Sequence, residues 1–215
     1  MTLVSSSLRR TLVAGASQAS QARRRESVAN GGSVAVGMLV VFVAAIILRV
    51  VVAGVAGRDS ATAGLVFGGV LFGVATAAGM RTRLGVRTMI IGVAGAVVLC
   101  APVVVVRVVA DVAPHRPAGS YATWAVVVCA VALAEEAFLR GALYSRLEAI
   151  GGPWLAVIGS AVCFAALHVP LYGWRAAAFD LAVGSWLGAL RHLSGSWVAP
   201  GIAHAGADLA AWWLR

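Results

Sequence analysis

The sequence contains no lysine, and charge of either sign is scarce. All 17 basic residues are arginine, only 8 residues are acidic, and the formal net charge is +9. Charged residues make up 12% of the 215 residues, roughly half the share of about 25% in soluble domains. With a hydrophobic fraction of 61% and a mean hydropathy of +0.93, this excludes an ordinary soluble domain. It predicts an all-α fold, a polytopic transmembrane helical bundle embedded in membrane lipid.

Cysteine is also scarce, and its positions exclude the usual cysteine chemistry. Cys100, Cys129 and Cys163 all lie in apolar segments, with no CxxC or Cys–His spacing. We interpret them as small buried hydrophobic residues. Residues 1–33 are basic and polar and lack the apolar core of a signal peptide. We expect 1–33 to form a cytoplasmic tail and 34–215 to form the transmembrane helical domain.

Long apolar runs are what the chain has in abundance. We expect about seven spans, within a range of six to eight, at about 34–57, 62–80, 86–110, 121–143, 154–171, 176–191 and 197–214. Most arginines fall in the tail and in alternate loops on the same side, although Arg49 and Arg107 fall within spans. This bias predicts a cytoplasmic N-terminus in the plasma membrane. It also explains the net charge without nucleic acid as a partner.

Glycine pairs with four-residue spacing recur in the apolar spans. They are Gly64/Gly68, Gly69/Gly73 and Gly184/Gly188. Such pairs let two helix backbones approach each other closely. They indicate helix packing and carry no information about function.

Three charges stand in the middle of the fourth predicted span, in the stretch LAEEAFLRG (133–141). An ionised residue near the bilayer centre costs about 2.5–3.5 kcal/mol on insertion scales, whereas a Leu or Ile returns only about 0.3–0.6 kcal/mol. Glu136 and Arg140 lie one helical turn apart with the acid first, which favours an ion pair. Glu135 is rotated by about 100° from Glu136. It is therefore less engaged by Arg140 and can contact a neighbouring helix.

Two later spans also carry polar groups one turn apart. The stretch CFAALHVP places Phe164 and His168 on one helix face, and IAHAGADLAAWW places His204 and Asp208 on one face. A carboxylate one turn from an imidazole fixes its tautomer and raises its basicity. If these spans converge, their carboxylates, imidazoles and arginine suffice for general-base catalysis or for holding a zinc ion.

These stretches match three motifs of one family. EEAFLR fits EExxxR, FAALH fits FxxxH and HAGAD fits HxxxN/D, in that order on predicted membrane helices. In this the chain resembles the CPBP family of CAAX proteases and bacteriocin-processing enzymes, also called Abi, over about 121–214. The resemblance implies an intramembrane endopeptidase, of glutamate type or a metalloprotease. Its substrate would be a membrane-associated protein or peptide, prenylated in the CAAX case.

The resemblance also implies a role for each motif residue. Glu135 would be the base that activates water, and His168 would help to hold that water. Arg140 would orient the glutamate pair, which includes Glu136. The remaining two residues, on the oxyanion side of the site, would be His204 and Asp208.

The cofactor and the last motif residue leave alternatives open. The family is described both as metal-dependent and as glutamate-type, so the resemblance allows a metal-free mechanism as well as zinc. The zinc ligands would be Glu135, His168, His204 and Asp208. The last position is often Asn, and an ionised Asp only accepts hydrogen bonds. Asp208 is therefore protonated, orients His204 or helps to bind metal.

Two other classes of protein would carry the same charges. A catalytically silent membrane protein, such as a maturation chaperone, regulator or immunity factor, would keep the fold and the buried polar cluster for structure. A small proton-linked transporter would use intramembrane Glu, His and Arg as a proton relay. Against a transporter, the sequence shows no inverted repeat of paired broken helices.

Overall fold

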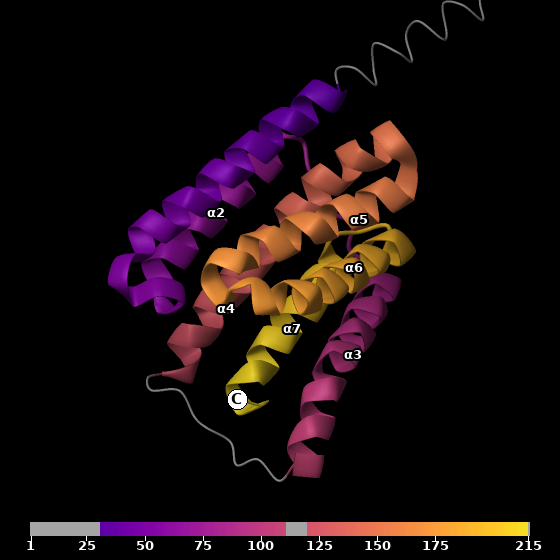
Figure 1. Cartoon of the computed structure of the whole chain (residues 1–215). Coiled ribbons are helices and arrows are strands. Elements are labelled where there is room, and N and C mark those ends of the chain that lie inside the picture. The colour runs from indigo at the N-terminus through magenta and orange to yellow at the C-terminus, as the bar shows by residue number, and fades with distance from the viewer. Residues whose placement is uncertain (1–30, 111–119, 215) are drawn as a thin grey trace, which may run out of the picture.

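The computed structural model of the chain describes residues 31–110 and 120–214. Within these residues every regular element is helical, which confirms the all-α prediction (Figure 1). The elements are a first helix Gly31–Ala53, followed by η1 Gly54–Asp59, α2 Ala61–Ala77, α3 Val86–Ala110, α4 Tyr121–Glu136, a π-helical segment η2 Ala137–Leu143, α5 Tyr144–Tyr172, η3 Trp174–Ala176, α6 Ala177–Ser194 and α7 Val198–Leu214.

The helices lie close to the predicted spans, with one clear difference. The fourth predicted span ends at 143, but the helix continues without a break from α4 through the π-helical segment into α5. The direction changes later, at Gly151 (φ −139°, ψ 19°) and Gly152 (φ 78°, ψ −176°). A positive φ of this kind suits glycine, which has no Cβ, and Pro153 starts the next helical stretch without needing a donor.

Within the described residues, Gly31–Ala53 and the continuous helix Tyr121–Tyr172 are long and apolar enough to cross a membrane. Ala61–Ala77 and Val86–Pro102 are shorter apolar helices. Aliphatic side chains face outward along the first helix and α3, with Val40 63% and Val97 63% exposed. An exposed aliphatic surface of this extent suits contact with lipid.

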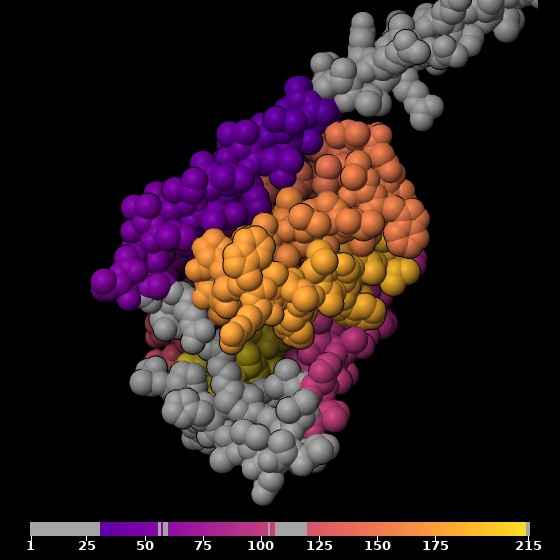
Figure 2. Space-filling model, in the orientation of Figure 1, coloured from indigo at the N-terminus to yellow at the C-terminus, as the bar shows by residue number. Residues whose placement is uncertain are grey.

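The polar motifs lie on the helices in the middle of the bundle. α7 packs against α3, α4 and α6, while α5 pairs with α6, and α2 packs on α4 and the π-helical segment. Figure 1 shows the first helix and α2 on one side and α3 on the other. In Figure 2 the first helix, α5 and α6 form the near surface. The carboxyl end of α4 is therefore enclosed by its neighbours.

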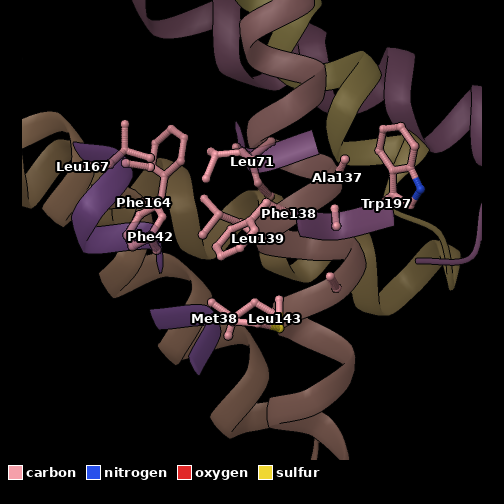
Figure 3. Packing of buried hydrophobic residues seen from close by; sticks show 14 of the residues in the cluster. Met38, Phe42, Leu71, Ala137, Phe138, Leu139, Leu143, Phe164, Leu167 and Trp197 are labelled. Carbon is pink, nitrogen blue, oxygen red and sulfur yellow. The ribbon is translucent and has the colours of Figure 1, made fainter. Parts of the chain in front are cut away.

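The π-helical segment is the centre of the apolar core. All seven of its residues are buried, and Figure 3 shows its side chains pointing toward those of the first helix, α2 and α5. Phe138 stacks on Phe42 of the first helix, with ring centroids 5.4 Å apart. Other core side chains around it are Met38, Leu71, Phe164, Leu167 and Trp197. This packing fixes the helix just where the three motif charges occur.

Two of the three glycine pairs make the close helix contacts that the spacing predicts. A Cβ added at Gly184 would lie 3.0 Å from the Cα and 3.1 Å from the carbonyl oxygen of Ala161 in α5, and Gly188 faces Val157 of the same helix. Gly64 and Gly68 face α4 in the same way. By contrast, Gly69 and Gly73 face open space, with nothing described within 4 Å.

We expect Gly184→Ala to destabilise the bundle by about 1–3 kcal/mol, because the new methyl group meets backbone atoms that cannot move aside. Gly73→Ala is the matched control in α2. It should leave stability unchanged or raise it by about 0.5–1 kcal/mol, since alanine favours a helix more than glycine does. The measurement is the free energy of unfolding in detergent. Equal stability of the two variants would contradict the α5–α6 contact.

Candidate functional site

Glu135 and Glu136 are the last two residues of α4, and Arg140 lies in the π-helical segment that follows. π-helical turns are rare and occur often at functional sites. All three side chains are almost completely buried, with relative exposures of 3% for Glu135 and 0% for Glu136 and Arg140. Burial of this kind is costly unless each charge has partners. The contacts of these three residues therefore define the site.

The predicted ion pair between Glu136 and Arg140 is present. Nη1 of Arg140 donates to Oε1 of Glu136 at 2.8 Å. Nη2 of Arg140 donates to the backbone carbonyl of Gly184 in α6 at 2.9 Å. Its guanidinium also lies over the ring of Phe164 in α5, 5.0 Å from the centroid. Arg140 is thus held by contacts to α4, α5 and α6, which fits the predicted orienting role.

His204 of α7 joins the same glutamate. Its Nδ1 lies 3.1 Å from Oε1 of Glu136, and its Nε2 lies 3.7 Å from Oδ2 of Asp208 one turn later. The imidazole is buried, whereas the side chain of Asp208 is 40% exposed. The predicted His204–Asp208 proximity is therefore found, and both ring nitrogens of His204 face carboxylates. Such a ring is fixed in orientation.

His168 of α5 has a defined tautomer. Its Nδ1 lies 2.9 Å from the backbone carbonyl of Phe164, and because a carbonyl only accepts, Nδ1 must carry the proton. In a neutral ring Nε2 is then the acceptor. The ring of Phe164 contacts both imidazoles, with centroids 4.5 Å from His168 and 5.3 Å from His204. The second and third motifs therefore meet at Phe164.

Glu135 has a partner that sequence reasoning missed. Nη1 of Arg49 in the first helix lies 3.4 Å from Oε1 of Glu135. The Arg49 guanidinium also lies over the ring of Phe67 in α2, 4.9 Å from its centroid. The signal for this contact was an arginine inside an otherwise apolar span, which needs an acid or a polar cavity. The spacing along the chain, 86 residues, gave no indication of which acid that would be.

The motif residues form one electrostatic cluster. The charge of Glu135 interacts with those of His204, Arg49, Asp208 and Glu136. His168 interacts electrostatically with His204, Arg49 and Arg140. The structure thus brings together all six predicted site residues and adds Arg49. The roles assigned to them remain predictions that the geometry allows.

The arrangement does not fit a zinc ion. Zinc needs three or four ligand atoms at about 2.0–2.3 Å from one point. Across residues 31–110 and 120–214, no group of three or more His, Cys, Asp or Glu side chains is placed to do this. Of the four residues that the sequence offered as zinc ligands, His204 turns both nitrogens toward carboxylates. These donor positions therefore support no metal-dependent step.

We expect Arg140→Leu to destabilise the protein by about 3–5 kcal/mol, because it leaves the buried Glu136 carboxylate without its cation. The double variant Glu136→Leu/Arg140→Leu should be less destabilised than Arg140→Leu, since it leaves no unpaired charge between these positions. The free energy of unfolding in detergent measures both. A double variant less stable than the single one would show that the ion pair is not the source of the effect.

Comparison with known proteins gives one match. Residues 117–210 match the family model described as type II CAAX prenyl endopeptidase Rce1-like. No curated protein and no solved structure matches the chain at the level required for significance. With the apolar helices, the match supports an integral membrane protein. The motifs and the family model agree, and residues 117–210, which carry the motif residues of the buried polar cluster, are similar to the type II CAAX prenyl endopeptidases of the Rce1-like family.

Proposed function

We propose that the protein is an intramembrane endopeptidase that hydrolyses a peptide bond with a water molecule activated by Glu135 and His168. The observation that carries the proposal is the buried network of Glu136, Arg140 and His204 beside Glu135, inside the matched domain. Helices that only pack in lipid have no use for so many desolvated charges, each of which costs several kcal/mol to bury. A reaction that creates and moves charge in a water-poor site does have a use for such buried charges.

In this mechanism Glu135 is the general base and His168 helps to hold the water. Glu135 has one described ion pair, to Arg49, and takes no part in the Glu136–Arg140 pair. His168 keeps its Nδ1 proton on the Phe164 carbonyl, so its Nε2 can accept a hydrogen bond from water. Proton transfer of this kind by a positioned side chain typically contributes about 10²–10⁴-fold to the rate.

Glu136, Arg140 and His204 act as positioning residues. Oε1 of Glu136 accepts from Arg140 and faces His204, so it joins the π-helical segment to α7. Asp208 lies on the far side of His204 and supports the orientation of its imidazole. Removing any one of these groups should shift the others and reduce activity without touching the base itself.

We propose a membrane-associated protein or peptide with a prenylated C-terminus as the substrate. The family description names CAAX prenyl endopeptidases. The exposed aliphatic faces of the first helix and α3 would let a prenyl chain approach from lipid. Cleavage would release the last residues of a CAAX sequence from the prenylated cysteine.

We also propose about seven spans, with the N-terminus in the cytoplasm. The support is the distribution of arginines at the end of the bundle where the first helix begins. There Arg81, Arg83, Arg146 and Arg191 line one cleft of about 1110 Å³ together with Gly31. Arg175 stands at the α5–α6 turn, outside this cleft. Arginine gathered on one side is the pattern of a cytoplasmic face.

The variant Glu135→Gln should abolish cleavage of a farnesylated CAAX peptide by the purified protein, with a loss of about 10²-fold or more. Glu148→Gln is the matched control, because Glu148 lines the arginine cleft and not the site. Both variants should insert and fold. Full activity of Glu135→Gln would reject the catalytic role, and a silent chaperone or regulator would tolerate this change. In cells, comparative proteomics of the wild type and this variant should find membrane proteins that keep an extra terminal segment.

Cysteine labelling tests the orientation. In a chain whose native cysteines are replaced by alanine, Arg175→Cys should react with a membrane-impermeant maleimide added to intact cells. Arg83→Cys should react only after the cells are permeabilised. Both positions are exposed, so accessibility within the protein does not limit either reaction. The reverse pattern would place the N-terminus outside.

A further inference from the structure

Hydrolysis of a peptide bond needs a donor for the oxyanion, and the contacts of His204 and Asp208, which the family resemblance places on the oxyanion side, leave no obvious donor there. Arg140 is fully buried and directs its Nη1 and Nη2 to Glu136 and the Gly184 carbonyl. Nδ1 of His204 is engaged by Glu136, and an oxyanion at its Nε2 would lie beside the Asp208 carboxylate, which is 3.7 Å away. An ionised Asp208 only accepts hydrogen bonds. A preorganised cation or N–H group aimed at the developing charge is a large part of catalysis in such reactions.

Arg49 is the cation that remains beside Glu135. Its Nη1 lies 3.4 Å from Glu135 Oε1, and this is the one hydrogen bond of its side chain within the described residues. The guanidinium also lies over the Phe67 ring, with Cζ 4.9 Å from the ring centroid. The side chain is 14% exposed, so it is held in place without being sealed off as Arg140 is. The guanidinium carries five N–H donors, which leaves several for a second acceptor.

We propose that Arg49 is a catalytic residue whose guanidinium stabilises the oxyanion formed when Glu135 activates water. This inference rests on the proposed endopeptidase function and adds to it a residue that lies outside the family match at 117–210. The first helix then has a chemical role as well as a packing role. Arg49 belongs to none of the three sequence motifs EExxxR, FxxxH and HxxxN/D.

The charge balance of the reaction explains why the cation belongs there. Glu135 takes one proton from water, the water oxygen bonds to the carbonyl carbon, and the π electron pair moves to the carbonyl oxygen. The negative charge thereby leaves the Glu135 carboxylate and appears on the oxyanion. When the C=O bond re-forms, the C–N bond breaks and the leaving amine takes the proton back from Glu135. No other reactant is needed.

Arg49 neutralises the negative charge both on the Glu135 carboxylate and, later, on the oxyanion. In the resting site its guanidinium pairs with the ionised Glu135. As the carboxylate becomes neutral, that pairing weakens, and the fork of N–H donors can hold the oxyanion beside it. The charge then moves past a fixed cation, and no unpaired charge is created in a medium of low dielectric constant. A purely structural arginine would stabilise the resting state and do nothing for this step.

The test compares Arg49→Leu, Arg49→Lys and the control Arg81→Leu on the farnesylated CAAX peptide. Arg81 lies in the exposed loop between α2 and α3. Arg49→Leu should lower kcat by about 10²–10³-fold with KM little changed, as for loss of one oxyanion donor. Arg49→Lys should keep part of the activity, because the cation remains without the fork. Arg81→Leu should match the wild type.

Added guanidinium ion separates catalysis from folding. It should restore part of the kcat of a further variant, Arg49→Ala, whose smaller side chain leaves room for the ion, whereas sodium chloride at the same ionic strength should not. It should not restore Glu135→Gln. If the wild type cleaves the peptide and Arg49→Leu keeps its kcat, or Arg49→Ala loses activity and guanidinium does not restore it, the role of Arg49 is overturned. If the wild type cleaves neither this peptide nor any membrane protein in a Glu135-dependent way, the proposed function itself fails.

Discussion

The ion pair between Glu136 and Arg140 is the interaction on which the interior of this bundle depends. Burying each ion costs several kcal/mol even after relaxation, and only good geometry with further hydrogen bonds offsets that cost. Here the pair is short, at 2.8 Å. Arg140 also binds the Gly184 carbonyl of α6 and the ring of Phe164 in α5, while Glu136 contacts His204 of α7. One desolvated pair thus joins α4, its π-helical continuation and three other helices.

Local spacing made part of this site predictable from the sequence. Residues one turn apart share a helix face whatever surrounds the helix, so the Glu136–Arg140 and His204–Asp208 proximities follow from the chain alone. The positions of the helices follow from the lengths of the apolar runs in the same way. The motif order then indicated the family, and the family model covers 117–210.

The remaining contacts depend on packing between distant segments. Arg49 and Glu135 are 86 residues apart, and their pairing requires that the first helix lie against α4 through contacts such as Phe42–Phe138. No local pattern specifies that register. The π-helical segment was also missed, because its residues, AFLRGAL, have ordinary α-helical preferences. The zinc alternative could be weighed only once the directions of the His204 nitrogens were known.

The π-helical segment has a consequence for the long helix that contains it. A π turn holds more residues per turn than an α turn, so the helix beyond Leu143 is out of phase with α4 by up to about 100° for each added residue. Beyond the segment, Tyr144 is buried, while Ser145 and Arg146 line the arginine cleft. The helix up to Gly151 can in this way direct the buried motif charges toward the bundle interior and Arg146 toward the cleft. Residue numbering across the segment consequently gives a poor guide to which side chains share a direction.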